Sequence, residues 1–436
     1  MQVQHPSPET QDMPSLPTAT GTATMPGRRD RGIPLRPERR SWFAPWWQAT
    51  LAVFPLFIVT RLVFVLLTYF GVILFSVPNY SMHALDFQTL LHAWARWDAL
   101  RFTTIATRGY LNLSYAAFFP LYPWLTRAFS IALHSDALAT GMVLSNLAFL
   151  ATLVVLYRLV ETEFNREVAR KSAFYLAIFP TALFFFAAYN ESLFILFTLL
   201  CFYALRRGRW WLAGLWAGLA TLTRSTGLLL AIAFLYEFAR QVFPILRNAW
   251  RERQFLPALK SLSGLPAILL IPLALGIYAR YLKYRYHNPL AFDHAQAYWR
   301  NGFSAPWTGA VQQIHTIFTL PPYTFFTAHD IIDVTALLFA LVLLILCFVG
   351  PVRFSVSQWS MPLFCLLALL LPLFFPGHGY DPLQSMQRFV LELFAVFIVL
   401  ARLAHRHAAL DRWYVTLALP MLAFFTLQFL LGHWTV

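Results

Sequence analysis

QATLAVFPLFIVTRLVFVLLTYFGVILF, residues 48–75, is an apolar run whose only charged side chain is Arg61. An α-helix needs about 20 consecutive apolar residues to span the hydrocarbon core of a bilayer, and this run exceeds that length. It is also too long, and too far from the start of the chain, for a cleaved signal peptide. The run therefore predicts a membrane-spanning helix that remains in the protein.

Similar apolar runs recur along the whole chain. Hydrophobic residues make up 59% of the 436 residues and charged residues 12%, about half the charged content of a soluble domain. The predicted fold class is therefore all-α, that of a polytopic membrane protein with about 11 crossings. The crossings are expected near residues 48–75, 138–160, 172–189, 191–206, 210–223, 226–243, 263–284, 331–350, 360–376, 388–403 and 413–433.

The distribution of basic residues predicts how the chain is oriented. Residues 1–45 are expected to be a disordered basic tail, because residues 1–40 are rich in Pro, Ser, Thr and Arg. Short cytoplasmic loops carry an excess of Lys and Arg, and this rule places the tail inside. Residues 46–436 then form the transmembrane domain, with residues 76–137 and 285–330 as long outer loops. We expect a multi-pass protein of a prokaryotic plasma membrane.

Two features of the outer loops add to this prediction. The apolar run 117–133 contains two prolines, and we expect it to form a helix that lies on the outer membrane surface. Arg280, Lys283 and Arg285 fall on the outer side, against the positive-inside rule.

The composition also argues against several other kinds of protein and site. The formal net charge is +14, but most basic residues lie in short loops between apolar segments, so no nucleic-acid partner is expected. The three cysteines lie in apolar runs and offer neither a disulfide framework nor a zinc spacing. The outer histidines are scattered, and no Gly-rich phosphate loop occurs, so we expect no metal site and no cofactor.

The first outer loop contains an acidic residue in an unusual setting. It reads RWDALRF at residues 96–102, which places Asp98 between two arginines and directly after Trp97. A carboxylate held in this way next to a membrane is suited to take a proton from a hydroxyl or to orient it. The alternative is that Asp98 only pairs with Arg101 on the surface of a helix. The residues alone leave both interpretations open.

Several short motifs lie between residues 97 and 389. They are Trp97-Asp98-Ala99, Gly109-Tyr110, Phe119-Pro120-Leu121-Tyr122-Pro123, Tyr189-Asn190-Glu191-Ser192, Gly218-Leu219-Ala220-Thr221-Leu222-Thr223-Arg224-Ser225-Thr226-Gly227, Pro289-Leu290-Ala291-Phe292 with Gln296 and Trp299, and Gln387-Arg388-Phe389. In their order and spacing these motifs resemble the PIG-V mannosyltransferase family, a branch of the GT-C glycosyltransferases.

The resemblance implies an all-α membrane enzyme of the GT-C type that uses a polyprenyl-phosphate sugar as donor and an acidic first-loop residue in catalysis. Carried over to this chain, Asp98 is expected to be the catalytic base. Family members often have His or an aromatic residue where this chain has Arg101, which puts the role of that neighbour in doubt. The eukaryotic members act on the GPI anchor, but this chain alone does not say that it makes one.

Further residues of these motifs are candidates for substrate binding. Glu191, together with Asn190, has the alternative of simply capping a hairpin between two helices. The candidates are Trp97, Arg101, Asn190, Glu191, Gln296 and Gln387.

Arg224 and Arg388 are expected at membrane depth, at the outer ends of apolar segments. A charge there is costly without a partner, and Glu237 and Glu392 are the only carboxylates near them along the same helices. The expected partner of both arginines is therefore the donor phosphate. The alternative for Arg224 is that its side chain reaches back to the membrane interface. The same alternative is less attractive for Arg388, because a cation at a helix N-terminus opposes the macrodipole. For Arg61 we favour a structural role over a third phosphate contact.

We therefore expect a membrane glycosyltransferase that moves a hexose, with mannose favoured, from a polyprenyl-phosphate donor to a hydroxyl of a lipid-linked or glycan acceptor. Transfer would take place on the outer face, among membrane lipids, and would invert the anomeric carbon. The alternative is a polytopic transporter or flippase of an anionic lipid. Transporters usually show internal repeats with paired broken helices, and we find no convincing repeat.

Overall fold

The computed structural model describes residues 43–76, 84–253, 255–379 and 381–433. Within these residues the regular secondary structure is helical, with no β-strand and one isolated bridge between Arg300 and Gly377. The predicted all-α fold class is therefore confirmed. The prediction of a disordered tail falls on residues that lie almost wholly outside the described part of the chain.

Six spans in the described residues are long and apolar enough to cross a membrane. Their outward faces carry bare apolar side chains such as Leu62 and Phe70, as expected for helices in contact with lipid. The spans contain α1 (Ala44–Ser76), α5 (Ala137–Glu163), α9 (Leu230–Arg251), α11 (Leu270–Tyr286), α14 (Phe325–Phe348) and α18 (Ala408–Leu430). The short α10 (Phe255–Leu262) precedes α11.

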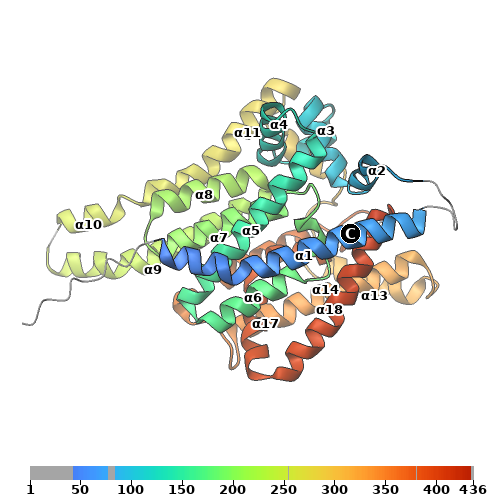
Figure 1. The fold of residues 1–436 in the computed structure, drawn as a ribbon. Coiled ribbons are helices and arrows are strands. Elements are labelled where there is room, and N and C mark those ends of the chain that lie inside the picture. Colours follow the sequence, from blue (N-terminus) through green and yellow to red (C-terminus); the bar gives the residue numbers. More distant parts are fainter. Residues whose placement is uncertain (1–42, 77–83, 254, 380, 434–436) are drawn as a thin grey trace, which may run out of the picture. The chain divides into compact units, whose positions relative to one another are not determined.

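Several shorter helices pack among these long ones. A helix of 15 residues is about 22 Å long, less than the roughly 30 Å of a hydrocarbon core. In α7 and α17 most side chains are buried by protein, and α7 lies against α5 and α8 while α17 lies against α6 and α14 (Figure 1). The shorter helices are α6 (Arg166–Ala177), α7 (Glu191–Leu205), α8 (Trp210–Thr223), α15 (Ser360–Phe374) and α17 (Phe394–Arg406).

The predicted helix at 172–189 is interrupted. α6 ends at Ala177, and the chain then forms turns and a 3-10 segment, η2 (Ala182–Phe185), before α7 begins at Glu191. Pro180 explains the break, because proline has no N–H to donate and disfavours helical backbone in the residue before it.

Three other predicted helices begin irregularly, and one of them is 263–284, where the 3-10 segment η4 (Leu265–Leu269) precedes α11. The 3-10 segment η3 (Ser225–Leu229) precedes α9, and α16 (Met386–Phe389) and η6 (Val390–Glu392) precede α17. Non-helical backbone inside apolar segments is tolerated where it is covered by protein or lines a cavity. These breaks are therefore the first places to look for a functional site.

The two predicted outer loops contain short helices that contact each other. The first loop holds α2 (Phe87–His92), α3 (Asp98–Arg108), η1 (Leu113–Ala117) and α4 (Leu121–Ala132), and the second holds α12 (Ala291–Gln296) and α13 (Thr308–Thr319). α12 packs on η1 and on α11 (Figure 1), and the ring centres of Trp124 in α4 and Tyr281 in α11 lie 5.5 Å apart.

The contact of the first loop with α11 also involves one of the basic residues that break the positive-inside rule. Nε of Arg285 donates a hydrogen bond to the carbonyl oxygen of Tyr110 at 3.0 Å, and the Tyr278 hydroxyl donates to the carbonyl oxygen of Ala116 at 2.9 Å. Arg285 thus binds the first loop, and this contact explains why a basic residue lies on the predicted outer side.

Candidate functional site

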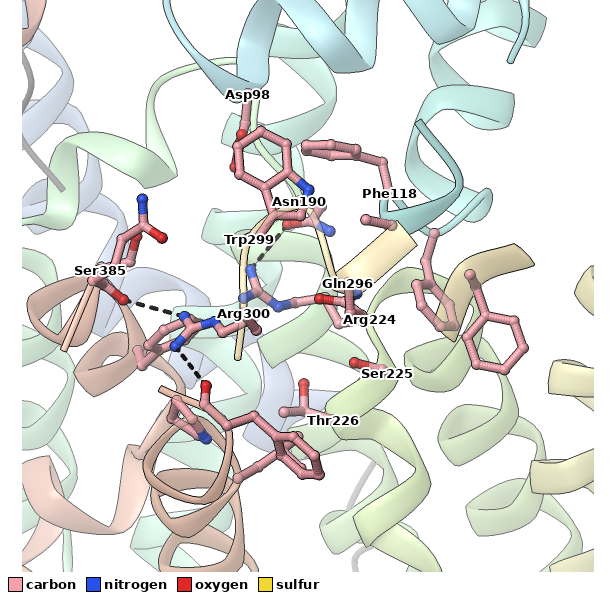
Figure 2. Close-up of a pocket in the computed structure, with 18 of the residues that line it drawn as sticks. Asp98, Phe118, Asn190, Arg224, Ser225, Thr226, Gln296, Trp299, Arg300 and Ser385 are labelled. Atoms are coloured by element: carbon pink, nitrogen blue, oxygen red, sulfur yellow. Dashed lines mark hydrogen bonds between the residues drawn. The ribbon is translucent and has the colours of Figure 1, made fainter. Parts of the chain in front are cut away.

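A cavity of about 650 Å³ lies where the two loops meet the irregular segments before α7, α9 and α17. Figure 2 shows Asp98 from the first loop, Gln296 and Arg300 from the second, and Arg224 from the segment before α9. Trp97 and Arg388 also line the cavity. Segments that are far apart in the sequence thus bring acidic, basic and aromatic side chains to one space.

A continuous chain of ion pairs runs through the wall of this cavity. Nη1 of Arg388 lies 2.5 Å from Oδ2 of Asp98, and its Nε lies 2.5 Å from Oε1 of Glu191. The same Glu191 oxygen lies 2.7 Å from Nη1 of Arg224, whose Nη2 lies 2.8 Å from Oε1 of Glu392. Glu191 is fully buried and shared by both arginines, so the five side chains form a single charged unit.

This arrangement differs from the expectation for the two arginines. We expected few carboxylate partners for Arg224 and Arg388, because only neighbours along the same helices were considered. The structure instead pairs them with carboxylates from the first loop, from α7 and from η6. Glu237 takes no part, since it pairs with Arg206 at 3.0 Å and Arg240 at 2.7 Å. The predicted role of Arg224 and Arg388 at the donor phosphate remains a prediction.

Asp98 does not pair with Arg101, which was the simpler interpretation of the first loop. The Arg101 guanidinium lies 4.5 Å from the ring centre of Trp299 and 5.5 Å from that of Phe118, a cation–π arrangement. Asp98 is the first residue of α3, where a carboxylate is favoured by the helix dipole. The residue before it, Trp97, has φ of +48°, a conformation that a bulky residue adopts only where the surroundings impose it.

The other predicted residues divide into those that line the cavity and those that do not. Asn190 and Gln296 line it. Nδ2 of Asn190 donates to the carbonyl oxygen of Thr223 at 2.9 Å, and its Oδ1 accepts from Arg224 at 3.2 Å, so Asn190 fixes the turn that presents this arginine. Glu191, Arg101 and Gln387 are not in the cavity lining. Glu191 is therefore more than a hairpin cap, because it joins two arginines behind the lining.

Arg61 lies apart from the cavity. Its Nη1 donates to Oδ1 of Asn146 at 3.0 Å, and its guanidinium lies 4.8 Å from the ring centre of Phe149 and 5.0 Å from that of Phe57. These contacts agree with the structural role that we favoured.

The chain is similar in sequence to a known family of proteins. The sequence model of the family described as Mannosyltransferase (PIG-V) matches residues 74–325, more than half of the 436 residues. This chain belongs to that family. The match covers both predicted outer loops almost completely and includes Asp98 and Arg224, whereas Arg388 lies beyond it.

Two relatives illustrate the extent of the similarity. GPI mannosyltransferase 2 of Yarrowia lipolytica is 30% identical over 227 residues, which are 49% of this chain and 59% of that protein. GPI alpha-1,6-mannosyltransferase 2 of Mus musculus is 32% identical over 208 residues, 45% of this chain and 42% of that protein. The matched part of this chain thus spans about half the length of these curated relatives.

Solved structures of two other proteins are distantly similar to this chain. ArnT from Cupriavidus metallidurans, bound to undecaprenyl phosphate, has a TM-score of 0.45 at 11% identity, over 86% of this chain and 75% of that one. The oligosaccharyltransferase AglB from Archaeoglobus fulgidus, in complex with an inhibitory peptide and a dolichol-phosphate, has a TM-score of 0.36 at 14% identity, over 89% and 56%.

Arg300 is a functional candidate that the sequence analysis missed. It lines the cavity, where it donates to the carbonyl oxygens of Gln384 at 3.2 Å and Phe375 at 3.3 Å, and no carboxylate of the described residues lies within 4.0 Å of it. Burial lowers the pKa of Arg300 to about 10, which still leaves it charged at neutral pH. Its position directly after the motif residue Trp299 was the only signal in the sequence.

A second feature that the sequence analysis missed lies behind the cavity wall. Side chains of His329, Asp330 and Asp381 each offer one potential metal-ligand atom, and these atoms lie within 4.8 Å of one another. We had expected no metal site, because the histidines alone showed no ligand spacing. The carboxylates next to His329 were not weighed with it.

Proposed function

We propose that this chain is a membrane glycosyltransferase. It transfers a hexose, with mannose favoured, from a polyprenyl phosphate to a hydroxyl of a lipid-linked or glycan acceptor. Membership of the PIG-V mannosyltransferase family supports the reaction class. The observation that carries the proposal is Asp98 at the cavity, ion-paired to Arg388 and connected through Glu191 to Arg224. The positive-inside bias of the loops supports an outer-face site and a cytoplasmic tail.

In the proposed reaction Asp98 acts as the general base. Arg388 contacts only Oδ2 of Asp98, which leaves Oδ1 to accept the proton of the attacking hydroxyl. The hydroxyl oxygen attacks the anomeric carbon, and the bond from that carbon to the phosphate oxygen breaks with its electron pair remaining on the phosphate. A single displacement of this kind inverts the anomeric carbon.

The leaving phosphate requires positive charge in the cavity wall. The ion-pair chain has one more carboxylate than arginine, so it would repel an anion if it stood alone. Arg300 supplies the missing positive charge, and its guanidinium and that of Arg224 lie 5.2 Å and 5.8 Å from the same Phe389 ring centre (Figure 2). The carboxylate contacts also leave Nε of Arg224 and Nη2 of Arg388 for phosphate oxygens. We therefore place the donor phosphate among these three arginines.

The proposal is tested with purified protein in liposomes that contain membrane lipids and radiolabelled polyprenyl-phosphate mannose. The expected result is label in a new glycolipid or glycan, with much less transfer from the matched glucose donor. Label that crosses the bilayer on the intact donor, without any new product, would favour a flippase and contradict the proposed reaction.

A further inference from the structure

We propose that a divalent cation binds among His329, Asp330 and Asp381, behind the wall of the cavity. His329 and Asp330 are neighbours in α14, and Asp381 lies in the segment that leads to α16. Three potential ligand atoms, one from each side chain, lie within 4.8 Å of one another. Ligands held by one cation at about 2.0 to 2.2 Å are at most about 4.4 Å apart, so a small side-chain movement closes the set.

The surroundings only partly balance the negative charge of this cluster, because Arg300 acts on Asp381 and Asp333 through its charge but forms no ion pair with either. A third carboxylate, Asp333, lies with its Oδ2 3.3 Å from Nδ1 of His329. Asp330 and Asp333 are 1% and 0% exposed, and in the described part of the chain no Lys or Arg lies within 4.0 Å of these two carboxylates or of Asp381. Burying ionised carboxylates without a counter-charge is costly, so a cation or extra protons must compensate them.

Unpartnered buried atoms distinguish this cluster from an ordinary acidic patch. Nε2 of His329 and Oδ2 of Asp330 have no hydrogen-bond partner among the described residues, and the neighbour of Oδ2 of Asp333 is the His329 ring nitrogen at 3.3 Å. Buried polar atoms are nearly always partnered, and each exception needs an explanation. A cation explains these atoms together, because carboxylate oxygens and a neutral imidazole are all electron-pair donors. Asp333 is placed to orient the imidazole, as carboxylates commonly do beside a metal-binding histidine.

The cluster is tied to the segment that presents Arg388 to the cavity. Nε2 of Gln313 donates to Oδ1 of Asp330 at 2.6 Å, and Oε1 of Gln313 accepts from the backbone N–H of Leu383 at 2.8 Å. The backbone N–H of Gln387 donates to Oδ1 of Asp333 at 3.3 Å. A cation here would therefore join α14 to the segment before α16 and hold Arg388 in position, without touching the substrate.

The set of ligands indicates the class of cation. Carboxylate oxygens alone would suit Mg²⁺ or Ca²⁺, whereas imidazole is a typical ligand of first-row transition metals. One imidazole with two carboxylates fits Mn²⁺ or Zn²⁺. This inference does not depend on the proposed transferase activity.

The test is a titration of the full-length protein, purified in detergent and stripped with a chelator, with Mn²⁺ followed by electron paramagnetic resonance. We expect one equivalent bound per chain, with a nitrogen coupling from an imidazole ligand, displacement by Zn²⁺, and no displacement by the same concentration of Mg²⁺. Absence of saturable binding, or bound Mn²⁺ without a nitrogen coupling, would overturn the proposal even if no variant could be made.

Variants locate the site. Asp330→Asn and Asp381→Asn should each weaken Mn²⁺ binding at least about ten-fold, a loss that metal sites show even when an outer residue is changed. The matched control is Asp293→Asn, since Asp293 is an exposed carboxylate in the cavity lining and lies outside the cluster. Binding that survives both cluster changes and disappears in the control would place the cation in the cavity, contrary to the proposal.

Discussion

Asp98 and Arg388 lie 290 residues apart in the sequence and meet in one ion pair beside the cavity. At the scale of single residues, the site differs from an ordinary buried salt bridge because its carboxylates outnumber its two paired arginines. Arg300 is the nearby cation that contacts carbonyl oxygens instead of carboxylates. The binding of an anion in the cavity should therefore depend on Arg300 more strongly than the stability of the fold does.

The first prediction concerns Arg300. Arg300→Ala should raise the KM for the polyprenyl-phosphate donor by about ten-fold to a hundred-fold, because each charge-assisted hydrogen bond contributes roughly 1.5 to 3 kcal/mol. Arg300→Lys should be intermediate, since lysine keeps the charge and loses the planar fork. The measurement is steady-state transfer with each substrate varied in turn. Arg108→Ala, at an exposed position in the first loop, is the control. A raised acceptor KM with an unchanged donor KM would assign Arg300 to the other substrate.

At the scale of helices, the position of Arg224 depends on how closely α8 approaches the start of α11. A Cβ added at Gly214 would lie 2.2 Å from the carbonyl oxygen of Ala267, and one added at Gly218 would lie 2.9 Å from that of Leu270. Small residues four apart allow two helix backbones to come this close. Because α8 ends directly before Arg224, this contact fixes one end of the ion-pair chain.

The second prediction tests that contact. Gly214→Ala should lower the free energy of unfolding by roughly 1 to 3 kcal/mol, and the purified protein should therefore have a lower thermal midpoint. The reason is that the added Cβ clashes with backbone, which cannot rotate away. Gly276→Ala in α11 is the matched control, since a Cβ there meets nothing within 4 Å. That change should leave stability equal or raise it by up to about 1 kcal/mol. Equal midpoints for both variants would show that the close approach is not required.

The helices also show which features could be predicted from the sequence and which could not. The range predicted for α8, residues 210–223, is the range observed, because an apolar run between charged ends is a local pattern. Glu191 was predicted to bind substrate or to cap a hairpin, and neither prediction included its pair with Arg388, which is 197 residues away. The cluster around Asp330 was missed for the same reason. The packing of helices that are far apart in the sequence decides which charged side chains form ion pairs. The periodicity of the sequence does not show this packing.

At the scale of the whole molecule, the direction of the chain in the membrane decides which side the cavity faces. The third prediction is that Arg108→Cys reacts with an impermeant thiol reagent in intact cells and Glu252→Cys does not, because the basic loops favour the cytoplasm. Both positions are exposed, and the three native cysteines are buried, so the background should be low. Labelling of Glu252→Cys alone would invert the orientation and put the cavity on the cytoplasmic face.

The central claim is that Asp98 is the base of a sugar transfer. The most direct measurement is the single-turnover rate of transfer from labelled polyprenyl-phosphate mannose by Asp98→Asn, beside Asp136→Asn from the same loop. Asparagine keeps the size of Asp98 and loses its basicity, so the rate should fall about 100-fold or more. Asp136 caps α5, and asparagine caps a helix equally well, so the control should keep its rate. An Asp98→Asn protein that transfers mannose as fast as the unmodified chain would contradict the claim.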